Sequence, residues 1–479
     1  MAKLVLIEPK APNLHIFTRF PLPRLGTIIL ATIARQKGWD AHVFVEEQGA
    51  IDWQEVAQAD LVGVSTVTST APRAYAIADR VRSKGIPVVL GGPHVTYMPE
   101  EAITHADYVL RGEAESSFPL FLEALTGQRP LEEVPNLVYR KDGTWQRTTV
   151  AAPPVVLDEI PFPDFSLVRG KQRTIGRKRI IPVQTSRGCP YNCSFCSVTG
   201  MFGRKYRFRS TENVIAELRR YDAPNNFVFF YDDNFAANPK RTRRLLEAMC
   251  AEGFRFKWST QVRADLTKDE DLVRLMRRAG CHTVFVGFET VNPASLQATG
   301  KHQTVKEMEH ATRIFRRHRI NVHGMFILGL DDDTFASVKA TVAFAKKHRL
   351  ASAQFLILTP LPGSQCFEQL RAEGRIAFTD WSLYDAHHVV FEPRGFSLWE
   401  LQMAQIWAHQ RFYSITTLVR RLLSLRLEEV AIAHYARRLN AVWRKKNSLY
   451  LRLLSLLKAK TGGRIKAEFW QDVAVDLPS

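Results

Sequence analysis

The sequence predicts an α/β protein with an N-terminal doubly wound parallel sheet, a central partial (β/α)6 barrel and a C-terminal helical region. Two observations lead to this prediction. Short apolar runs alternate with segments of helical spacing along two stretches of the chain, and beyond residue 391 only helical spacing continues. The 479 residues suffice for two or three domains with cores of their own. The expected boundaries are 1–127 for the first sheet, 128–178 for a linker, 179–390 for the barrel and 391–479 for the helices.

Composition favours a cytoplasmic location. The chain has no run of eighteen or more apolar residues, and the apolar run before Glu8 is too short for a signal peptide. Six cysteines, three of them clustered, do not form a disulfide framework. The N-terminal residues are therefore expected to form the first strand of a protein that works in a reducing compartment.

The net charge of +18 is concentrated near the C-terminus, where residues 411–468 hold 14 Lys and Arg against three acidic residues. Three interpretations stay open. The basic helices lie on the inner face of a membrane, they cap the barrel mouth and attract an anionic substrate, or they are solvated helix faces. Nucleic acid is disfavoured because the tail shows no RNA-binding module and no aromatic stacking pattern.

In the N-terminal half, strands are expected at 3–8, 41–46, 61–66, 87–91 and 107–110, and helices at 25–37, 71–84 and 116–125. Parallel sheets of this kind bind ligands at the carboxyl ends of their strands. The loops there are rich in small and hydroxyl residues, which let a backbone approach a large ligand. A dinucleotide is not favoured, because no G-x-G-x-x-G occurs. The candidate ligand residues are Leu25, Gly26, Ser65, Thr66, Thr68, Gly91, Gly92, His94, Gly112 and Glu113.

Repeated prolines and a hairpin expected around residues 141–143 indicate a linker over 128–178. The alternation then resumes, with strands expected at 180–185, 227–231, 257–262, 283–287, 322–328 and 353–358. Six β/α units make an incomplete barrel, whose active site is expected at the carboxyl ends of the strands.

Cys189, Cys193 and Cys196 lie on the loop that leaves the first of these strands. Thiolates ligate iron–sulfur clusters, usually four to a cubane, so three cysteines leave one iron open to a substrate or cofactor. A zinc site that lacks its fourth ligand and three free thiols are the alternatives. Zinc is disfavoured because no nearby His or second Cys pair follows at the spacing of a zinc site.

The triplet Cys189-x-x-x-Cys193-x-x-Cys196, with Phe195 before the last cysteine, resembles the signature of the radical S-adenosylmethionine (SAM) enzymes. In that family the open iron binds the amino and carboxylate groups of SAM, and one electron from the cluster cleaves SAM to a 5′-deoxyadenosyl radical. The resemblance implies a [4Fe-4S] cluster on the three cysteines, SAM, and a reductant such as flavodoxin or ferredoxin.

Polar residues follow the other barrel strands. The sequence places Tyr231, Asp232 and Asp233 after the second strand, Gln261 and Arg263 after the third, Gly287 and Glu289 after the fourth, and Gly324 and Gly329 along and after the fifth. The two aspartates fit helix capping or a turn about as well as proton transfer. Arg263 is placed to hold the SAM carboxylate by a bidentate pair. By resemblance, Glu289 accepts hydrogen bonds from SAM and the two glycines support its adenine. A loop carboxylate without a ligand is the alternative for Glu289.

The N-terminal half resembles the cobalamin-binding domain that precedes many radical SAM barrels. The resemblance lies in Pro23-Arg-Leu-Gly26, in Gly91-Gly-Pro-His-Val-Thr96 and in the segment from Asp107 to Glu113. It implies that the loops named above bind cobalamin. The D-x-H-x-x-G motif of other cobalamin domains is missing, so another group is expected at the lower axial position of cobalt, or none. His94 fits a structural role better than ligation.

The combined resemblance implies a cobalamin-dependent radical SAM enzyme that methylates an unactivated carbon of a small molecule. The basic C-terminal helices suggest that this substrate is apolar or anionic. Ring closure or rearrangement without methyl transfer is the first alternative, and Tyr231, Asp232 or Asp233 would accept a proton in either reaction. A cluster-bearing enzyme that modifies RNA is the second.

Overall fold

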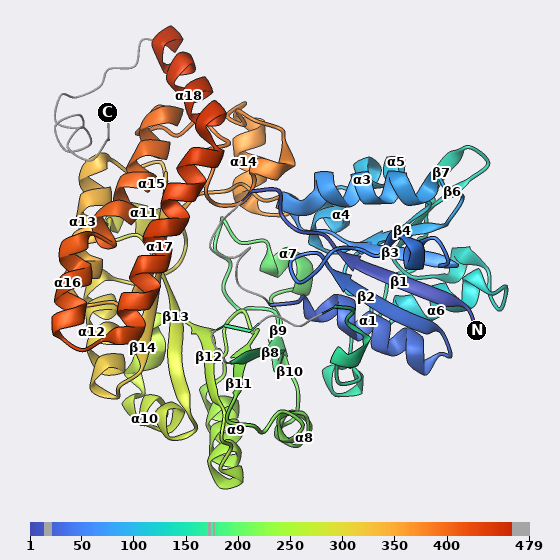
Figure 1. Cartoon of the computed structure of the whole chain (residues 1–479), viewed down its shortest axis with the longest axis horizontal. Helices are drawn as coiled ribbons and strands as arrows, with labels where there is room; N and C mark the ends of the chain where they lie inside the picture. The colour runs from blue at the N-terminus through green and yellow to red at the C-terminus, as the bar shows by residue number, and fades with distance from the viewer. Residues whose placement is uncertain (14–21, 171–173, 176–177, 462–479) are drawn as a thin grey trace.

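The computed structural model describes residues 1–13, 22–170, 174–175 and 178–461 of the chain (Figure 1). Two sheets lie beside each other, and a layer of C-terminal helices covers the side of the second sheet that is remote from the first. This arrangement confirms the predicted fold class. Among the described helices, none has the length and apolar character needed to cross a bilayer.

The N-terminal sheet has seven strands in the order β2-β1-β3-β4-β5-β6-β7. The first five strands pair in parallel, as predicted, and the last two are antiparallel. The strands are β1 (Lys3–Glu8), β2 (Asp40–Val45), β3 (Leu61–Ser65), β4 (Val88–Gly91), β5 (Tyr108–Leu110), β6 (Leu137–Lys141) and β7 (Thr144–Arg147).

Helices cover both faces of this sheet and form two separate apolar cores. One face carries α1 (Leu25–Gln36) and α6 (Ser117–Leu125), and the other carries α3 (Ala71–Arg82), α4 (Pro93–Tyr97) and α5 (Pro99–His105) (Figure 1). The short α2 (Trp53–Val56) precedes β3. Because β1, β3 and β4 are buried on both faces, they are continuous runs of Val, Leu and Ile.

The predicted hairpin at residues 141–143 is present as the turn between β6 and β7. Asp142 and Gly143 both have positive φ, which matches the right-handed twist of the two strands. The hairpin pairs with β5, so the first part of the predicted linker lies on the edge of the N-terminal sheet. Short 3-10 turns at Leu157–Glu159 and Phe165–Leu167 follow on the way to the barrel.

The second sheet has six parallel strands in consecutive order, which is the topology predicted for a partial barrel. They are β8 (Arg179–Val183), β11 (Asn226–Phe230), β12 (Lys257–Val262), β13 (Cys281–Glu289), β14 (Asn321–Leu328) and β15 (Ser352–Ile357). A two-stranded ribbon, β9 (Ser186–Arg187) and β10 (Arg207–Phe208), stands at the carboxyl end of β8.

Helices pack on the outer face of this sheet. Most of the helices that follow barrel strands begin after a Ser, Thr, Asn or Asp, whose side chain accepts a hydrogen bond from a backbone N–H of the first turn, and these residue types favour a helix start. The outer helices are α8 (Thr211–Arg219), α9 (Pro239–Glu252), α10 (Glu270–Arg278), α11 (Pro293–Ala298), α12 (Val305–Arg317) and α13 (Phe335–Lys347). After β15, α14 (Gln365–Ala372) lies beside the cysteine loop instead, where the Cys366 N–H donates to the Ser194 carbonyl (Figure 1). The short α7 (Val198–Phe202) follows the cysteine loop.

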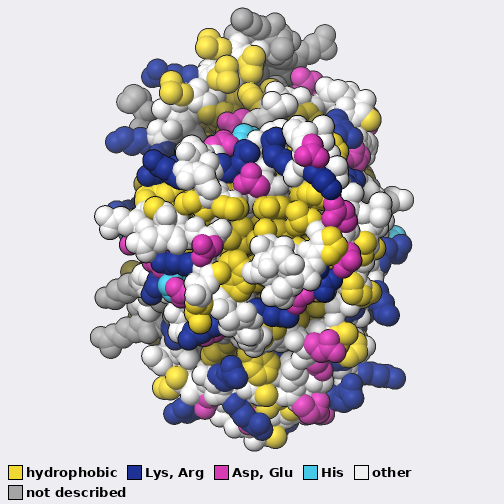
Figure 2. Space-filling view, turned by 90° about the vertical axis from the view of Figure 1, so that its right-hand side faces the viewer, with side chains coloured by type: hydrophobic (Ala, Val, Ile, Leu, Met, Phe, Trp, Pro, Cys, Tyr) yellow, Lys and Arg dark blue, Asp and Glu magenta, His cyan; other side chains and the backbone are white. Residues whose placement is uncertain are grey.

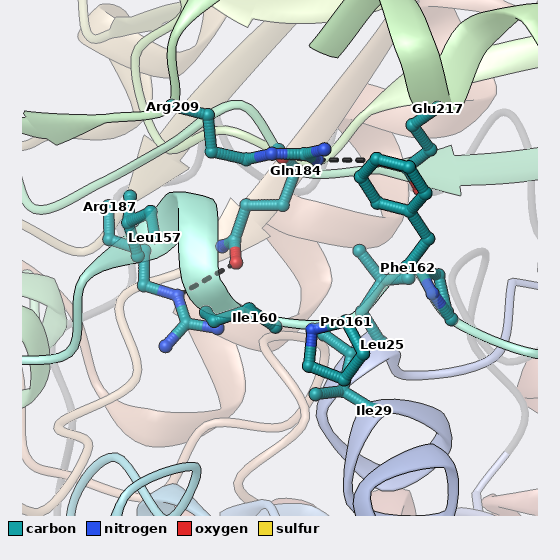
Figure 3. A pocket seen from close by; sticks show the side chains of 11 residues that line it. Leu25, Ile29, Leu157, Ile160, Pro161, Phe162, Gln184, Arg187, Arg209 and Glu217 are labelled. Atoms are coloured by element: carbon teal, nitrogen blue, oxygen red, sulfur yellow. Dashed lines mark hydrogen bonds and ion pairs between the residues drawn. The ribbon is translucent and has the colours of Figure 1, made fainter. Parts of the chain in front are cut away.

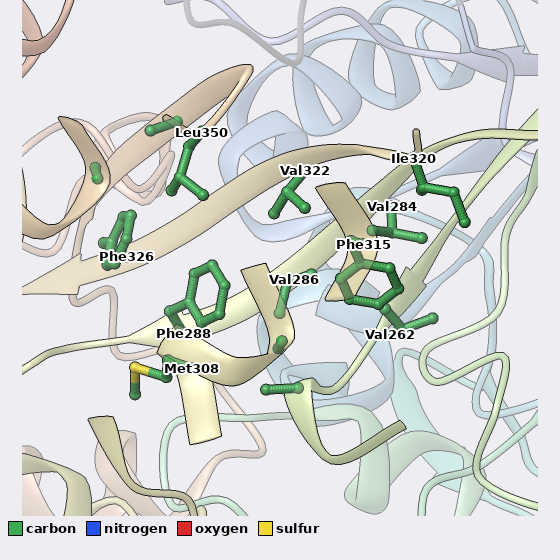
Figure 4. Packing of buried hydrophobic residues seen from close by; sticks show 14 of the residues in the cluster. Val262, Val284, Val286, Phe288, Met308, Phe315, Ile320, Val322, Phe326 and Leu350 are labelled. Atoms are coloured by element: carbon green, nitrogen blue, oxygen red, sulfur yellow. The ribbon is translucent and has the colours of Figure 1, made fainter. Parts of the chain in front are cut away.

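Alternate residues of the barrel strands face opposite ways, so one set fills the outer core and the other faces the barrel interior. The outer set includes Val284, Val286 and Phe288 of β13, packed against Val322 and Phe326 of β14 (Figure 4). The interior set includes the adjacent, half-buried Phe285 and Met325. This parity decides which predicted site residues reach the interior.

The C-terminal layer consists of α15 (Leu398–Phe412), α16 (Ile415–Leu423), α17 (Leu427–Lys446) and α18 (Ser448–Thr461). Helical spacing continues over residues 397–417 and predicts one helix there, but this prediction is wrong, because Ser414 caps the start of α16 by accepting from the Thr417 N–H. Tyr413 in the break covers the free edge of β15, where its hydroxyl donates to the Ala353 carbonyl at 2.8 Å and accepts from the Ala353 N–H at 3.0 Å.

Candidate active site

The three cysteines of the predicted cluster motif share one loop between β9 and β10, at the carboxyl edge of the barrel. All three are free and partly exposed. The Ser194 N–H donates to the Thr299 carbonyl at 3.4 Å, and the Cys366 N–H donates to the Ser194 carbonyl at 2.9 Å. The end of α11 and the start of α14 thus hold the loop in place.

Gly188, the residue before the first cysteine, has no room for a side chain. Its φ is +84°, and a Cβ would stand 2.6 Å from the Lys205 carbonyl oxygen. A glycine is therefore required where the chain leaves the ribbon and enters the loop.

Burial raises the pKa of all three thiols, that of Cys196 to about 12. The charges of Lys301 and Arg263 oppose this rise at Cys193. Within the described residues, no three His, Cys, Asp or Glu side chains converge on a point that would suit a single metal ion. Three sulfurs that each bind a different iron need no such convergence, so this donor set fits an iron–sulfur cluster.

Glu289 forms a buried ion pair with Lys301, a residue that sequence reasoning missed. Glu289 ends β13 at an irregularity in the ladder and has a φ of +61°. A Cβ on Gly287 would lie 2.4 Å from Glu289 Oε1 and 2.5 Å from Lys301 Nζ. Gly287 thus leaves space for this pair. The alternative that Glu289 is a carboxylate on the surface of a loop is wrong, because Glu289 is only 7% exposed.

The Arg263 side chain is also buried, and it connects the cysteine loop with the segment that holds Lys301. Its guanidinium carbon lies 3.7 Å from the centroid of the Tyr191 ring in the cysteine loop. Its Nη2 donates to the Lys301 carbonyl at 2.6 Å, and its Nε donates to Asp265 at 3.3 Å. Gln261, two residues earlier, is half-buried on β12.

The acidic pair after β11 divides into two environments. Asp232 is fully buried and accepts hydrogen bonds from the Thr185 N–H at 3.1 Å, the Thr185 hydroxyl at 3.0 Å and the Ser186 hydroxyl. It fixes the chain that leads into the cysteine loop. Asp233 Oδ2 is buried without a hydrogen-bond partner, and burial together with the Asp232 charge raises the pKa of Asp233 to about 7.

Tyr231, beside them, is 39% exposed at the side of the barrel that faces the N-terminal sheet. The charges nearest its hydroxyl include Arg24 and Glu8 of that sheet. Tyr231 is thus partly exposed toward the space between the sheets, whereas Asp232 and Oδ2 of Asp233 are buried.

The two glycines of the fifth strand segment are explained by packing. A Cβ on Gly324 would meet Leu350 at 2.6 Å in the outer core, away from the barrel interior. A Cβ on Gly329 would meet Leu401 of α15 at 2.6 Å. Asp333 accepts from the Gly329 N–H at 3.0 Å and holds the turn. The prediction that Gly324 and Gly329 support adenine thus rests on the family resemblance alone.

The loops predicted to bind cobalamin lie together at the carboxyl edge of the N-terminal sheet, which faces the barrel. Arg24, before Leu25 and Gly26, donates from its backbone N–H to Glu8 at 2.8 Å and from Nη1 to the Ser65 carbonyl at 3.2 Å. Gly26 is exposed, with open space where a Cβ would stand. Among the described residues, nothing stands within 4 Å of that position, so this edge is open at Gly26, as a large ligand requires.

Leu25 faces a different space, a pocket between α1, the linker and the barrel (Figure 3). Phe162 and Pro161 of the linker form one wall, and Arg187 and Gln184 of the barrel form another. The Leu25 side chain therefore contributes to the contact between domains.

Hydrogen bonds among the predicted residues shape the neighbouring loops. The Thr66 hydroxyl donates to the Gly91 carbonyl at 2.8 Å, and Thr68 lies buried in the following turn. Gly92 has a φ of +103°, and a Cβ there would lie 2.4 Å from the Thr66 carbonyl oxygen. The Gly112 N–H donates to the Thr96 hydroxyl at 2.9 Å. These residues set the backbone course of the edge.

His94 is a packing residue, as sequence reasoning favoured. Its side chain is fully buried between Tyr75 and Trp381, and its nearest carboxylate oxygen, on Glu101, lies 3.7 Å away. The Trp381 indole donates to the same carboxylate at 3.0 Å. The cluster joins α4 and α5 to the segment after the barrel.

Glu113 belongs to a buried ion-pair network between the two sheets. Arg187, two residues before Cys189, donates to Glu113 at 2.7 Å and to Glu115 at 2.5 Å. Arg207 donates to the other oxygen of Glu113, also at 2.7 Å. Burial opposes ionisation of Glu115, but the charge and hydrogen bond of Arg187, a backbone hydrogen bond and the Arg207 charge together outweigh it and lower the pKa of Glu115. The loop after β5 thus holds the entry to the cysteine loop.

Tyr97 makes a second contact between the two edges. Its hydroxyl donates to the Ser197 carbonyl at 3.3 Å, next to Cys196. Its ring fills the space beside Gly363, where a Cβ would lie 2.3 Å away, and its hydroxyl stands beside Gly200. The sequence did not point to three residues of this site, Lys301, Arg187 and Tyr97. The available signals were two adjacent glycines, Gly300 beside Lys301 and Gly188 beside Arg187.

Comparison with known proteins agrees with this geometry. The family profile of the Radical SAM superfamily matches residues 183–345, and that of the B12 binding domain matches residues 18–122. An uncharacterized methyltransferase of Pyrococcus horikoshii is 31% identical over 404 residues, 82% of this chain and 88% of the relative. Bacteriochlorophyllide d C-12(1)-methyltransferase of Chlorobaculum tepidum is 30% identical over 399 residues, 82% of this chain and 83% of the relative.

Among solved structures, the cobalamin-dependent S-adenosylmethionine radical enzyme OxsB with aqua-cobalamin bound shares the fold. The TM-score is 0.69 at 16% identity, with 100% of this chain and 81% of that chain covered. The chain therefore belongs to the radical SAM superfamily and carries a B12 binding domain. It is an enzyme, and its cofactors are a [4Fe-4S] cluster, SAM and cobalamin, as the sequence predicted.

Proposed function

We propose that the enzyme methylates an unactivated carbon of a small molecule. The observation that carries this proposal is the contact between the two carboxyl edges, where Arg187 and Tyr97 join the cobalamin-binding domain to the cysteine loop. Methyl transfer between two cofactors and one substrate carbon requires both cofactor sites to open onto one space, and this contact supports that arrangement.

Cys189, Cys193 and Cys196 hold three irons of the cluster in this proposal. When bound, the cluster and SAM supply a radical that removes hydrogen from carbon, and methylcobalamin supplies the methyl group. Glu289 accepts hydrogen bonds from the hydroxyl or amino groups of SAM, and Lys301 pairs with this carboxylate and orients it. Arg263 positions Tyr191 and Lys301, since its guanidinium already contacts both.

The substrate lies against Tyr231 and Asp233. Tyr231 is exposed toward the N-terminal sheet, and Asp233 has a carboxylate oxygen without a partner. Asp233 accepts a hydrogen bond or a proton from the substrate, and Asp232 acts as a positioning residue. The interior near these groups is lined by Phe229 and Phe285, whose ring centroids are 5.7 Å apart, which favours an apolar substrate over a strongly charged one. Flavodoxin or ferredoxin supplies the electron.

The test uses anaerobically reconstituted holoenzyme, dithionite and SAM with a deuterated methyl group, incubated with a small-molecule extract. The expected result is 5′-deoxyadenosine together with a product that carries the labelled methyl group. A variant in which Cys189, Cys193 and Cys196 are all alanine is expected to lose its iron and form neither product. The matched control is Cys250→Ala, which removes a partly exposed cysteine on α9 and leaves activity unchanged.

Formation of 5′-deoxyadenosine with an unlabelled, dehydrogenated or ring-closed product would contradict methyl transfer and support ring closure. Retention of the cluster by the triple variant would contradict the assignment of the cysteines.

A further inference from the structure

The outer surface of the C-terminal layer exposes a stripe of large apolar side chains. On α16 the stripe consists of Ile415, Val419, Leu422 and Leu423, which are 64%, 48%, 49% and 79% exposed. Their spacing of four, three and one residues places them on one side of the helix. Soluble proteins seldom expose contiguous apolar surface of this kind without a partner.

The stripe stands on a helix that is held firmly to the barrel. The Arg421 side chain is buried, donates from Nη2 to the Leu350 carbonyl at 3.1 Å and pairs with Glu429 at 3.4 Å. Leu418 packs against the barrel core. Since the inward side of α16 is anchored in this way, the apolar side is fixed outward.

Cations surround the stripe. Arg411 and Arg420 are exposed, and burial together with their charges lowers the pKa of the nearby Lys346 at the end of α13. In the described part of the chain, no carboxylate forms an ion pair with any of these three side chains. The surface beside the stripe therefore carries positive charge without internal compensation.

Exposed apolar side chains beside an exposed cation also occur on α18, the helix that follows α17. Leu449, Leu453 and Leu456 of α18 are 79%, 44% and 63% exposed, and Arg452 is exposed among them. Apolar side chains stand out at the top of the molecule, where α18 lies (Figure 2). Since α17 has 20 residues, about 30 Å of helix separates the two apolar groups.

We propose that the outer surface of α16, α17 and α18 docks on an anionic phospholipid bilayer, with the leucines entering the interface and the arginines contacting lipid phosphates. Apolar side chains framed by unpaired Arg and Lys are the pattern of interfacial helices. A second copy of the chain fits less well. A two-fold contact would bring the cluster of Arg411, Arg420 and Lys346 against its own copy, and like charges repel.

The experiment is flotation of the full-length holoenzyme with vesicles of equal parts phosphatidylcholine and phosphatidylglycerol, and with phosphatidylcholine alone. Wild type is expected to float with the anionic vesicles, less so at high salt, and not with phosphatidylcholine alone. Replacing Ile415, Val419, Leu422 and Leu423 by serine is expected to weaken binding roughly tenfold or more. The pair Arg411→Glu and Arg420→Glu, which leaves the apolar stripe intact, is expected to weaken it by a similar factor.

The matched control replaces Trp145 and Val150, which are 47% and 42% exposed in the N-terminal half, by serine, and it is expected to bind like wild type. Iron and cobalamin contents equal to those of wild type show that each variant is folded. The proposal is overturned if wild type does not float with anionic vesicles, or if the serine variant and the glutamate variant both float as well as the control. It is also overturned if wild type is a dimer that the serine variant dissociates.

Discussion

Replacing Arg187 by methionine is expected to lower the free energy of unfolding by about 3–5 kcal/mol, the usual cost of removing one partner from a buried ion pair. The side chain is 5% exposed and contacts Glu113 and Glu115, which are 15% and 9% exposed. Glu113 keeps Arg207 as a partner at 2.7 Å. The carboxylate left uncompensated is therefore that of Glu115.

This reasoning makes the double variant informative. Replacing Glu115 by glutamine in addition removes the orphaned charge, so Arg187→Met with Glu115→Gln is expected to recover most of the lost stability, to within about 2 kcal/mol of wild type. The control Arg219→Met breaks a bidentate pair with Glu252 on the surface, where the Arg219 side chain is 61% exposed. It is expected to leave the stability close to that of wild type, because solvent screens an exposed pair.

The pH dependence gives an independent signature. In wild type the pKa of Glu115 is lowered, so the stability from this group is present at neutral pH and is lost as pH falls through its folded value. In Arg187→Met the charge and the hydrogen bond of Arg187 no longer oppose burial, and only a backbone hydrogen bond and the Arg207 charge still do, so the pKa of Glu115 rises. The variant is therefore expected to gain stability relative to wild type as pH falls from about 7 toward about 4.

The assay is urea unfolding followed by tryptophan fluorescence at several pH values. Equal stability of wild type and Arg187→Met would refute the argument. So would a double variant that is as unstable as the single variant at every pH.

Two further predictions concern the barrel. Lys301→Met is expected to lower the free energy of unfolding by about 3–5 kcal/mol, because it leaves the buried Glu289 carboxylate unpaired. The double variant that also carries Glu289→Gln is expected to regain resistance to urea but not cleavage of SAM. Restored cleavage would show that Glu289 does not bind SAM. Burial lowers the pKa of His323 to about 4, so as pH falls this histidine takes up a proton in the unfolded chain before it does so in the folded chain. Wild type is therefore expected to lose about 3 kcal/mol of its free energy of unfolding between pH 6.5 and 4. His323→Gln is expected to lose correspondingly less in urea unfolding over that range, and an unchanged pH profile would contradict this.

The elements of both sheets were predictable because their signals are local. Apolar runs of strand length alternate with helical spacing, and capping residues such as Thr304 and Thr334 mark the helix starts. The cysteine loop was predictable for a similar reason, since its three thiols are close in sequence. The break at Ser414 was missed because helical spacing continues across it, and only the capping hydrogen bond separates the two helices.

The partners of the site residues were not predictable. Glu289 pairs with Lys301 across a loop, and Glu115 pairs with Arg187 from another domain. Gly324 and Gly287 look alike in sequence, yet one faces the outer core and the other faces the ion pair. Which side a strand residue takes depends on the register of the strand in the sheet.

By itself the sequence determined the three-part architecture, the clustered thiols and the family whose cofactors they serve. These properties depend on residue type and short-range spacing, which the chain carries before it folds. The tertiary structure decided which charges meet, which of two adjacent aspartates is enclosed, and where the apolar stripe of α16 emerges. Those outcomes depend on distances between segments far apart in the chain, and packing alone sets them.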